Sequence, residues 1–235
     1  MILSSIVDFF AYRQDSRNIP VLTKEEWEQL ISQHSKDDIR DSLACFIMKA
    51  GTKFPLKIIK KDDMRRLFHD FYNTSMEKLY KEFDVVLERY DYKYKYADKP
   101  LGVIDKTHYY NDISDYFQQV NRMKCGSNSV DSPMEIWYNE QKLAKMNWHF
   151  WRAGVMEDSG INDAAFRTGF RLGTYTATQF KPSVAKALYE RHRAENVLDT
   201  SCGWGDRLAG FYGTPNTKLY VGCDPNPDVF EVYKN

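Results

Sequence analysis

The sequence predicts an α/β protein, in which a mainly helical N-terminal region, residues 1–133, precedes the start of an α/β domain, residues 134–235. Two observations support this fold class. Apolar residues recur at helical spacing through the first 90 residues. Residues 196–224 read as a short strand, a glycine turn that opens a helix, and a second strand that ends on an acid. The turn-forming residues at 125–133 mark the boundary between the two regions.

The composition indicates a globular protein of the cell interior. The chain has 235 residues, 43% of them hydrophobic, which is enough to bury a sizeable core. The 33 basic and 33 acidic residues cancel, so any nucleic-acid-binding surface must be a local patch. The four cysteines form no C-x-x-C pair, which favours reduced thiols in a cytoplasmic protein. The histidines lack metal-ligand spacing and no apolar run approaches the roughly 20 residues of a membrane span, so we expect no metal and no membrane partner.

Start signals identify the N-terminal helices. Thr23 and Glu26 form a capping box, in which each side chain satisfies an exposed backbone N–H group, and Ser35 is expected to cap the next helix. Apolar stripes predict a third helix over residues 60–72 and a fourth over residues 75–90.

Residues 90–96, Tyr-Asp-Tyr-Lys-Tyr-Lys-Tyr, alternate aromatic and charged side chains, which is the period of a strand. Tyrosines interleaved with lysines could stack on bases and contact phosphates. A half-buried edge strand with solvated charges explains the same pattern. A helical pattern then follows over residues 134–151.

The glycine turn of residues 196–224 is the most informative stretch. Asp199 ends the first strand, and Gly203 and Gly205 permit a turn too tight for a Cβ atom. Such a turn lets backbone N–H groups approach a ligand closely. Asp206 is expected to cap the helix that follows.

Two cofactor classes share this geometry. A dinucleotide site needs a third small residue, where this chain has Leu208, and an acid at Asp199 would lie beside a phosphate. An acid at that position suits a cationic group instead, such as the α-ammonium of S-adenosylmethionine. Asp224, at the tip of the second strand, can accept both hydroxyls of an adenosine ribose. We therefore expect a methyl donor rather than a dinucleotide.

Residues 199–205, Asp-Thr-Ser-Cys-Gly-Trp-Gly, resemble motif I of the class I S-adenosylmethionine-dependent methyltransferases, in the D-P-x-x-G-x-G form found in DNA amino-methyltransferases. Residues 221–224 resemble motif II of that family, whose acid holds the ribose. Residues 179–188 are similar to motif X, in which an aromatic residue packs against the methionine part of the cofactor. Two positions depart from the pattern, because Thr200 replaces the usual proline and Ser201 replaces the first glycine of many members.

This resemblance implies a Rossmann-like methyltransferase domain that binds S-adenosyl-L-methionine. The residues expected to bind it are Phe180, Asp199, Ser201, Cys202, Gly203, Trp204, Gly205 and Asp224. Two of these positions carry alternatives. Phe180 could fill the core instead of contacting a ligand, and the position of Cys202 near a helix start could lower the pKa of its thiol.

The activity that the resemblance implies is methyl transfer to an exocyclic amino group of a DNA base, adenine N6 or cytosine N4. The family's catalytic tetrapeptide, (Asp/Asn/Ser)-Pro-Pro-(Tyr/Phe), does not occur in the sequence. We therefore expect the catalytic residues in a missing C-terminal part of the domain, a truncated chain that is inactive alone, and a sheet with exposed edges and an uncovered apolar face. An RNA or small-molecule methyltransferase and a non-catalytic nucleic-acid-binding module are the alternative interpretations.

DNA is the expected partner, and three basic residues near the motif X stretch are candidates to contact it. Arg167, Arg171 and Lys181 could bind phosphates. Ordinary surface charge is the default explanation for them.

Overall fold

The computed structural model describes the backbone of residues 2–82, 86–89, 92–95, 101–103, 108–152 and 160–234. Side chains are described within residues 6–79, 108–147 and 160–234. The chain forms two compact units, and each unit is built from two separate stretches. We call Met1–Ile58 with Val120–Ala177 the helical unit, and Ile59–Gln119 with Thr178–Asn235 the sheet unit.

This division differs from the predicted boundary between residues 1–133 and 134–235. The predicted boundary follows turn-forming residues, which are a local signal. The observed units are defined by contacts between residues far apart in the sequence, which local patterns do not reveal. The coarser prediction of a mixed helical and sheet protein with a parallel strand pair is confirmed.

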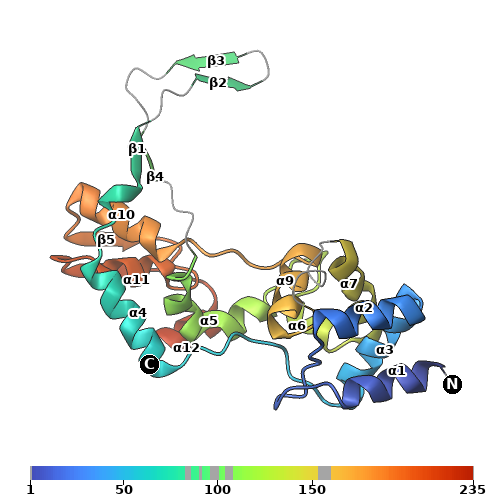
Figure 1. The fold of residues 1–235 in the computed structure, drawn as a ribbon. Coiled ribbons are helices and arrows are strands. Elements are labelled where there is room, and N and C mark those ends of the chain that lie inside the picture. Colours follow the sequence, from blue (N-terminus) through green and yellow to red (C-terminus); the bar gives the residue numbers. More distant parts are fainter. Residues whose placement is uncertain are drawn as a thin grey trace. The chain divides into compact units, whose positions relative to one another are not determined.

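The described residues of the helical unit form packed helices. They are α1 (Ile2–Ala11), α2 (Lys24–Gln33), α3 (Lys36–Lys49), α6 (Pro133–Trp137), α7 (Glu140–Arg152) and α9 (Asp163–Gly173). In Figure 1, α3 packs against α1 and α7, and α7 packs against α9. The capping box of Thr23 and Glu26 begins α2 as predicted, and the Ser35 hydroxyl caps α3.

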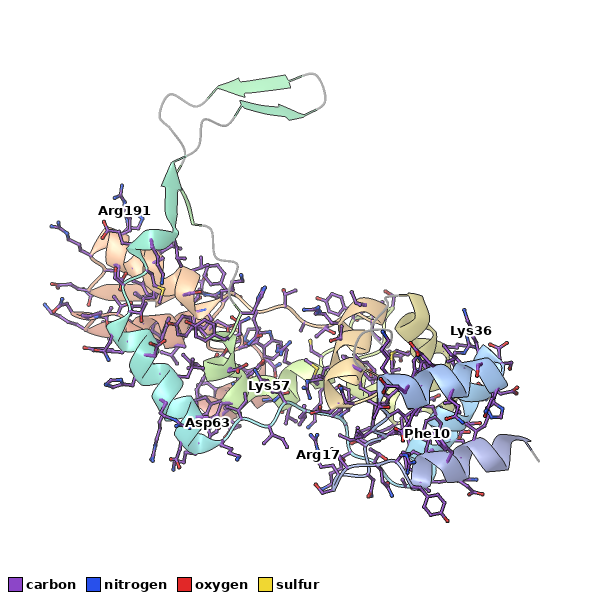
Figure 2. The ribbon with its side chains drawn as sticks, viewed as in Figure 1. Phe10, Arg17, Lys36, Lys57, Asp63 and Arg191 are labelled. Atoms are coloured by element: carbon purple, nitrogen blue, oxygen red, sulfur yellow. The ribbon has the colours of Figure 1, made fainter. Side chains whose placement is uncertain are left out.

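An aromatic core joins the two stretches of the helical unit. The ring of Trp137 lies 5.7 Å from that of Phe54 and 5.3 Å from that of Phe166, measured between centroids. The Trp137 indole N–H also donates to the Thr52 carbonyl at 2.8 Å, which satisfies its polar group inside the core. Phe10 of α1 is fully buried in the same apolar cluster (Figure 2).

The sheet unit contains short helices and three two-stranded sheets within its described residues. Its elements are α4 (Lys61–Asn73), η1 (Glu77–Leu79), β1 (Tyr80–Glu82), β2 (Val86–Arg89), β3 (Tyr92–Lys95), β4 (Leu101–Val103), α10 (Pro182–His192), β5 (Asn196–Asp199), α11 (Asp206–Gly213), β6 (Leu219–Gly222) and α12 (Pro227–Tyr233). Helix α5 (Asn111–Lys124) begins in this unit and ends in the helical unit.

Two predictions for residues 75–96 have different outcomes. The helix expected over residues 75–90 is wrong, because η1, β1 and β2 occupy this stretch. The strand expected over residues 90–96 is confirmed over residues 92–95, which form β3 and pair antiparallel with β2. The tyrosine and lysine side chains of that strand lie outside the described residues, so their proposed contact with bases stays a prediction.

Strands β5 and β6 form a parallel pair, with Leu198 beside Val221, and α11 connects them. Helices α10 and α11 lie side by side (Figure 1). The ring of Phe211 in α11 contacts the ring of Tyr220 in β6, with 5.4 Å between centroids. One face of the strand pair is therefore covered by a helix.

The opposite face of this strand pair is open. Leu198 is 72% exposed, Leu219 54% and Val221 46%. Apolar side chains on parallel strands are normally covered on both faces, which makes this surface unusual. The exposed face agrees with the expectation from the sequence.

A buried lysine links the two stretches of the sheet unit. Lys186 of α10 donates to the carbonyl oxygens of Phe71 and Tyr72, the latter at 2.8 Å, where α4 ends. Glu190 lies 3.6 Å from the ammonium nitrogen. Burial lowers the pKa of Lys186, and Glu190 opposes this shift. The last carbonyls of a helix carry negative partial charge, so the ammonium is well placed to hold α4 against α10.

Candidate ligand site at the glycine turn

The glycine turn connects the carboxyl end of β5 to the start of α11. Gly203 and Gly205 have φ angles of 55° and 82°, in the left-handed region that favours glycine. The Cys202 N–H donates to the Cys223 carbonyl, and the Cys223 N–H donates to the Asp199 carbonyl, each at 2.9 Å. These two bonds fix the turn beside the end of β6.

Asp199 is enclosed by hydrogen-bond donors. Its carboxylate accepts from the Arg207 Nε at 2.7 Å, from the Tyr220 hydroxyl at 2.6 Å and from the Ser201 N–H at 3.1 Å. It is 8% exposed. Burial alone would raise the pKa of Asp199, but the hydrogen bonds from Tyr220, Arg207 and Ser201 outweigh burial and lower it. The carboxylate is therefore charged and already neutralised by a cation of the protein.

Phe180 does not fill the core, because its side chain is 40% exposed. The Arg207 guanidinium lies over its ring, 5.2 Å from the centroid. The Trp204 indole N–H donates to the Thr178 carbonyl at 3.1 Å, which ties the segment before α10 to the glycine turn. The predicted motif X and motif I stretches are thus brought together.

A cavity of about 300 Å³ lies at this junction. It is lined by Thr178, Gln179, Phe180, Ser201, Cys202, Gly203, Trp204, Asp206 and Arg207. Arg207 belongs to this lining, whereas Asp199 does not. Trp204 also lines a second cavity of about 590 Å³, whose wall is mainly apolar and comes from α4, α5, α11 and α12.

Asp206 does not cap α11 as predicted. Gly205 occupies the N-cap position, and the buried Asp206 carboxylate accepts from the Ser114 hydroxyl and from the Phe180 N–H, the latter at 3.2 Å. Gln179 lies 3.5 Å away as a further donor. Asp206 therefore joins α5, the segment before α10 and α11. The sequence gives no signal for this role, because Ser114 is 92 residues distant.

Asp224 holds the glycine turn from the tip of β6. Its carboxylate accepts from the Gly203 N–H at 2.7 Å and from the Asn226 N–H at 2.9 Å. A carboxylate has about four lone-pair sites, so these two bonds leave capacity for further donors. The Tyr233 hydroxyl donates to the Gly203 carbonyl from α12.

Cys202 is buried beneath this turn. Burial raises the pKa of its thiol, and the nearby carboxylates of Asp224 and Asp199 add to the rise. The lowering that its position near a helix start suggests is therefore overcome. Cys202 acts here as a small packing residue rather than as a thiolate.

The three basic residues proposed to contact nucleic acid belong to different units. Arg167 and Arg171 lie on α9 in the helical unit, whereas Lys181 precedes α10 in the sheet unit. Arg167 is engaged by Asp163, with 2.7 Å between the nitrogen and oxygen atoms. Asp163 also pairs with Arg17, which is labelled in Figure 2, with 3.0 Å between the nitrogen and oxygen atoms.

Within the ranges that the structure describes, no group of three His, Cys, Asp or Glu side chains could hold a metal ion. A search of the same described residues found no helix with the length and apolar character of a membrane span. No protein-family model, curated protein or solved structure matches this chain. The chemistry of the site's own residues is therefore the basis for assigning a function.

Proposed function

We propose that the sheet unit binds S-adenosyl-L-methionine and that the protein serves in methyl transfer to an exocyclic amino group of a DNA base, adenine N6 or cytosine N4. The observation that carries this proposal is the junction at the carboxyl ends of β5 and β6. There a glycine turn and an exposed aromatic ring at Phe180 line one cavity, and Asp224 accepts from the Gly203 N–H of that turn. Ligands of α/β proteins bind at this end of parallel strands.

The residues present fit such a ligand. A Cβ atom built on Gly203 would meet only the Ser201 carbonyl oxygen, at 3.8 Å, so the outer side of the turn is open. The cavity volume, about 300 Å³, is at the lower limit for small-molecule sites. Asp224 retains lone pairs that can accept ribose hydroxyls. When bound, the cofactor supplies an activated methyl group, and the protein's contribution is mainly to place it in line with the acceptor nitrogen.

The acceptor is the part of the proposal that depends on sequence resemblance. The open face of β5 and β6 leads us to propose a further polypeptide that covers Leu198, Leu219 and Val221 and completes the domain. We propose that acceptor-binding and catalytic residues belong to that polypeptide. RNA and small molecules are the alternative acceptors, because the same cofactor would supply the methyl group to them.

Calorimetric titration of the chain with S-adenosyl-L-methionine tests the proposal. We expect one molecule bound per chain, and Asp224→Asn should weaken binding by roughly tenfold or more, because a hydrogen bond to a charged group contributes about 1.5–3 kcal/mol. Asp228→Asn is the matched control, since Asp228 lies exposed on the next helix. Failure of the unaltered chain to bind would refute the proposal, and DNA binding without cofactor binding would favour the non-catalytic module.

A further inference from the structure

The cavity at the glycine turn presents a cation to its ligand. Sequence reasoning expects Asp199 to face a positively charged group, yet Arg207 lies among the residues that line the cavity and Asp199 does not. The first turn of α11 carries Arg207, and its side chain reaches back to the end of β5. The cavity lining therefore includes a guanidinium.

The guanidinium is held in one orientation by three contacts. Its Nε donates to Asp199 at 2.7 Å, its Nη2 donates to the Ser201 carbonyl, and its face lies over the Phe180 ring. Nη1 has no hydrogen-bond partner among the residues that the structure describes. The side chain is 27% exposed, so part of it is reachable from the cavity.

The acid among the residues that line the cavity, Asp206, has donors of its own. The Asp206 carboxylate is directed to the Ser114 hydroxyl, the Gln179 amide and the Phe180 N–H. A guanidinium with unused N–H groups binds carboxylates in particular, because its planar donors match the two oxygens. An ammonium group, in contrast, would be repelled by it.

We propose that Arg207 binds the α-carboxylate of the ligand's amino-acid group, with Asp199 keeping the guanidinium in place. This inference rests on the proposed function. It adds to it the group of the cofactor that Arg207 contacts, the α-carboxylate. It replaces the direct contact between Asp199 and the ligand's ammonium group that the sequence suggests.

A ligand that lacks only the carboxylate separates this inference from the proposed function. Decarboxylated S-adenosylmethionine keeps the adenosine, the sulfonium and the ammonium group. The unaltered chain should bind S-adenosyl-L-methionine at least about tenfold more tightly than the decarboxylated form, since the loss of a hydrogen bond between charged groups changes affinity by about this factor or more. Equal binding of the two ligands would overturn the role of Arg207 and leave the proposed function standing. Binding of neither would overturn both.

Substitutions of Arg207 then test whether this residue causes the preference for the ligand that carries the carboxylate. Arg207→Gln should bind the two ligands equally, because the loss affects only the ligand that carries the carboxylate. Arg207→Lys should retain part of the preference, because the charge remains. Arg191→Gln is the matched control, on an exposed arginine of α10 that is labelled in Figure 2. A full preference in Arg207→Gln would contradict the inference. Because each variant is compared with itself on two ligands, a general loss of affinity does not imitate the expected result.

Discussion

Gly205→Ala tests whether the left-handed turn and its contact with α12 hold the site together. Gly205 has a φ of 82°, and an added Cβ would lie 3.2 Å from the Cε1 atom of Tyr233. The left-handed conformation costs a residue with a Cβ roughly 1–2 kcal/mol. Displacing Tyr233 would also weaken the hydrogen bond from its hydroxyl to the Gly203 carbonyl, which contributes about 0.5–1.5 kcal/mol. We expect a total destabilisation of about 1.5–3.5 kcal/mol.

Gly51→Ala is the matched control for this substitution. Gly51 has a φ of 61°, and a Cβ there would meet nothing within 4 Å. Both variants place a Cβ atom on a residue in the left-handed region, and both restrict the unfolded chain equally. The difference between them, about 0.5–1.5 kcal/mol, isolates the contact with Tyr233.

Native-state hydrogen exchange measures each unit separately, which a single unfolding curve for a protein of two units does not. Exchange in residues 196–224 should accelerate by roughly ten- to several-hundredfold in Gly205→Ala, since each 1.4 kcal/mol is a factor of ten. In a Tyr233→Ala background the substitution should cost only the backbone strain. The reasoning is refuted if Gly205→Ala costs no more than Gly51→Ala, or if its extra cost persists without Tyr233.

Two further predictions concern buried charges. Lys186→Met should destabilise the sheet unit by about 1–4 kcal/mol, because two carbonyls at the end of α4 lose their donor. Hydrogen exchange in residues 61–73 should therefore accelerate. Unchanged protection of these residues would contradict the role of Lys186. The folded-state pKa of Asp199 is lowered, so its contribution to stability is complete above about pH 4 and is lost as the pH falls through the folded-state value. Asp199→Asn should therefore flatten the loss of unfolding free energy of the sheet unit below about pH 4, measured by native-state hydrogen exchange in residues 196–224. A slope equal to that of the unaltered chain would count against this assignment.

The sequence predicts those parts of the fold that are determined by interactions between residues close together in the chain. Thr23 and Glu26 begin α2 through bonds that span three residues, and the glycine turn follows from residues adjacent in the chain. The helix expected over residues 75–90 is wrong because an apolar spacing compatible with a helix occurs in a stretch that pairs as strands. Strand pairing depends on partners that the local pattern does not contain.

The candidate site follows the same division. Gly203, Gly205 and Asp224 are predicted from the turn itself, and the structure brings them together. The partners of Asp206 could not be predicted, since they come from distant segments. Arg207 could have been found, because a buried acid such as Asp199 requires a cation, and Arg207 lies eight residues on at the start of α11.

The interleaved chain path has a consequence for how the protein is made and cut. The backbone passes between the units at residues 58/59, 119/120 and 177/178. During synthesis, the first 58 residues must wait until residues 120–177 emerge before their core can close, and the intervening segment must wait for its own partner. A single proteolytic cut at any crossing would leave the two units joined by the other connections. Neither unit can be isolated as one continuous fragment, so studying one alone requires joining its two stretches by a new linker.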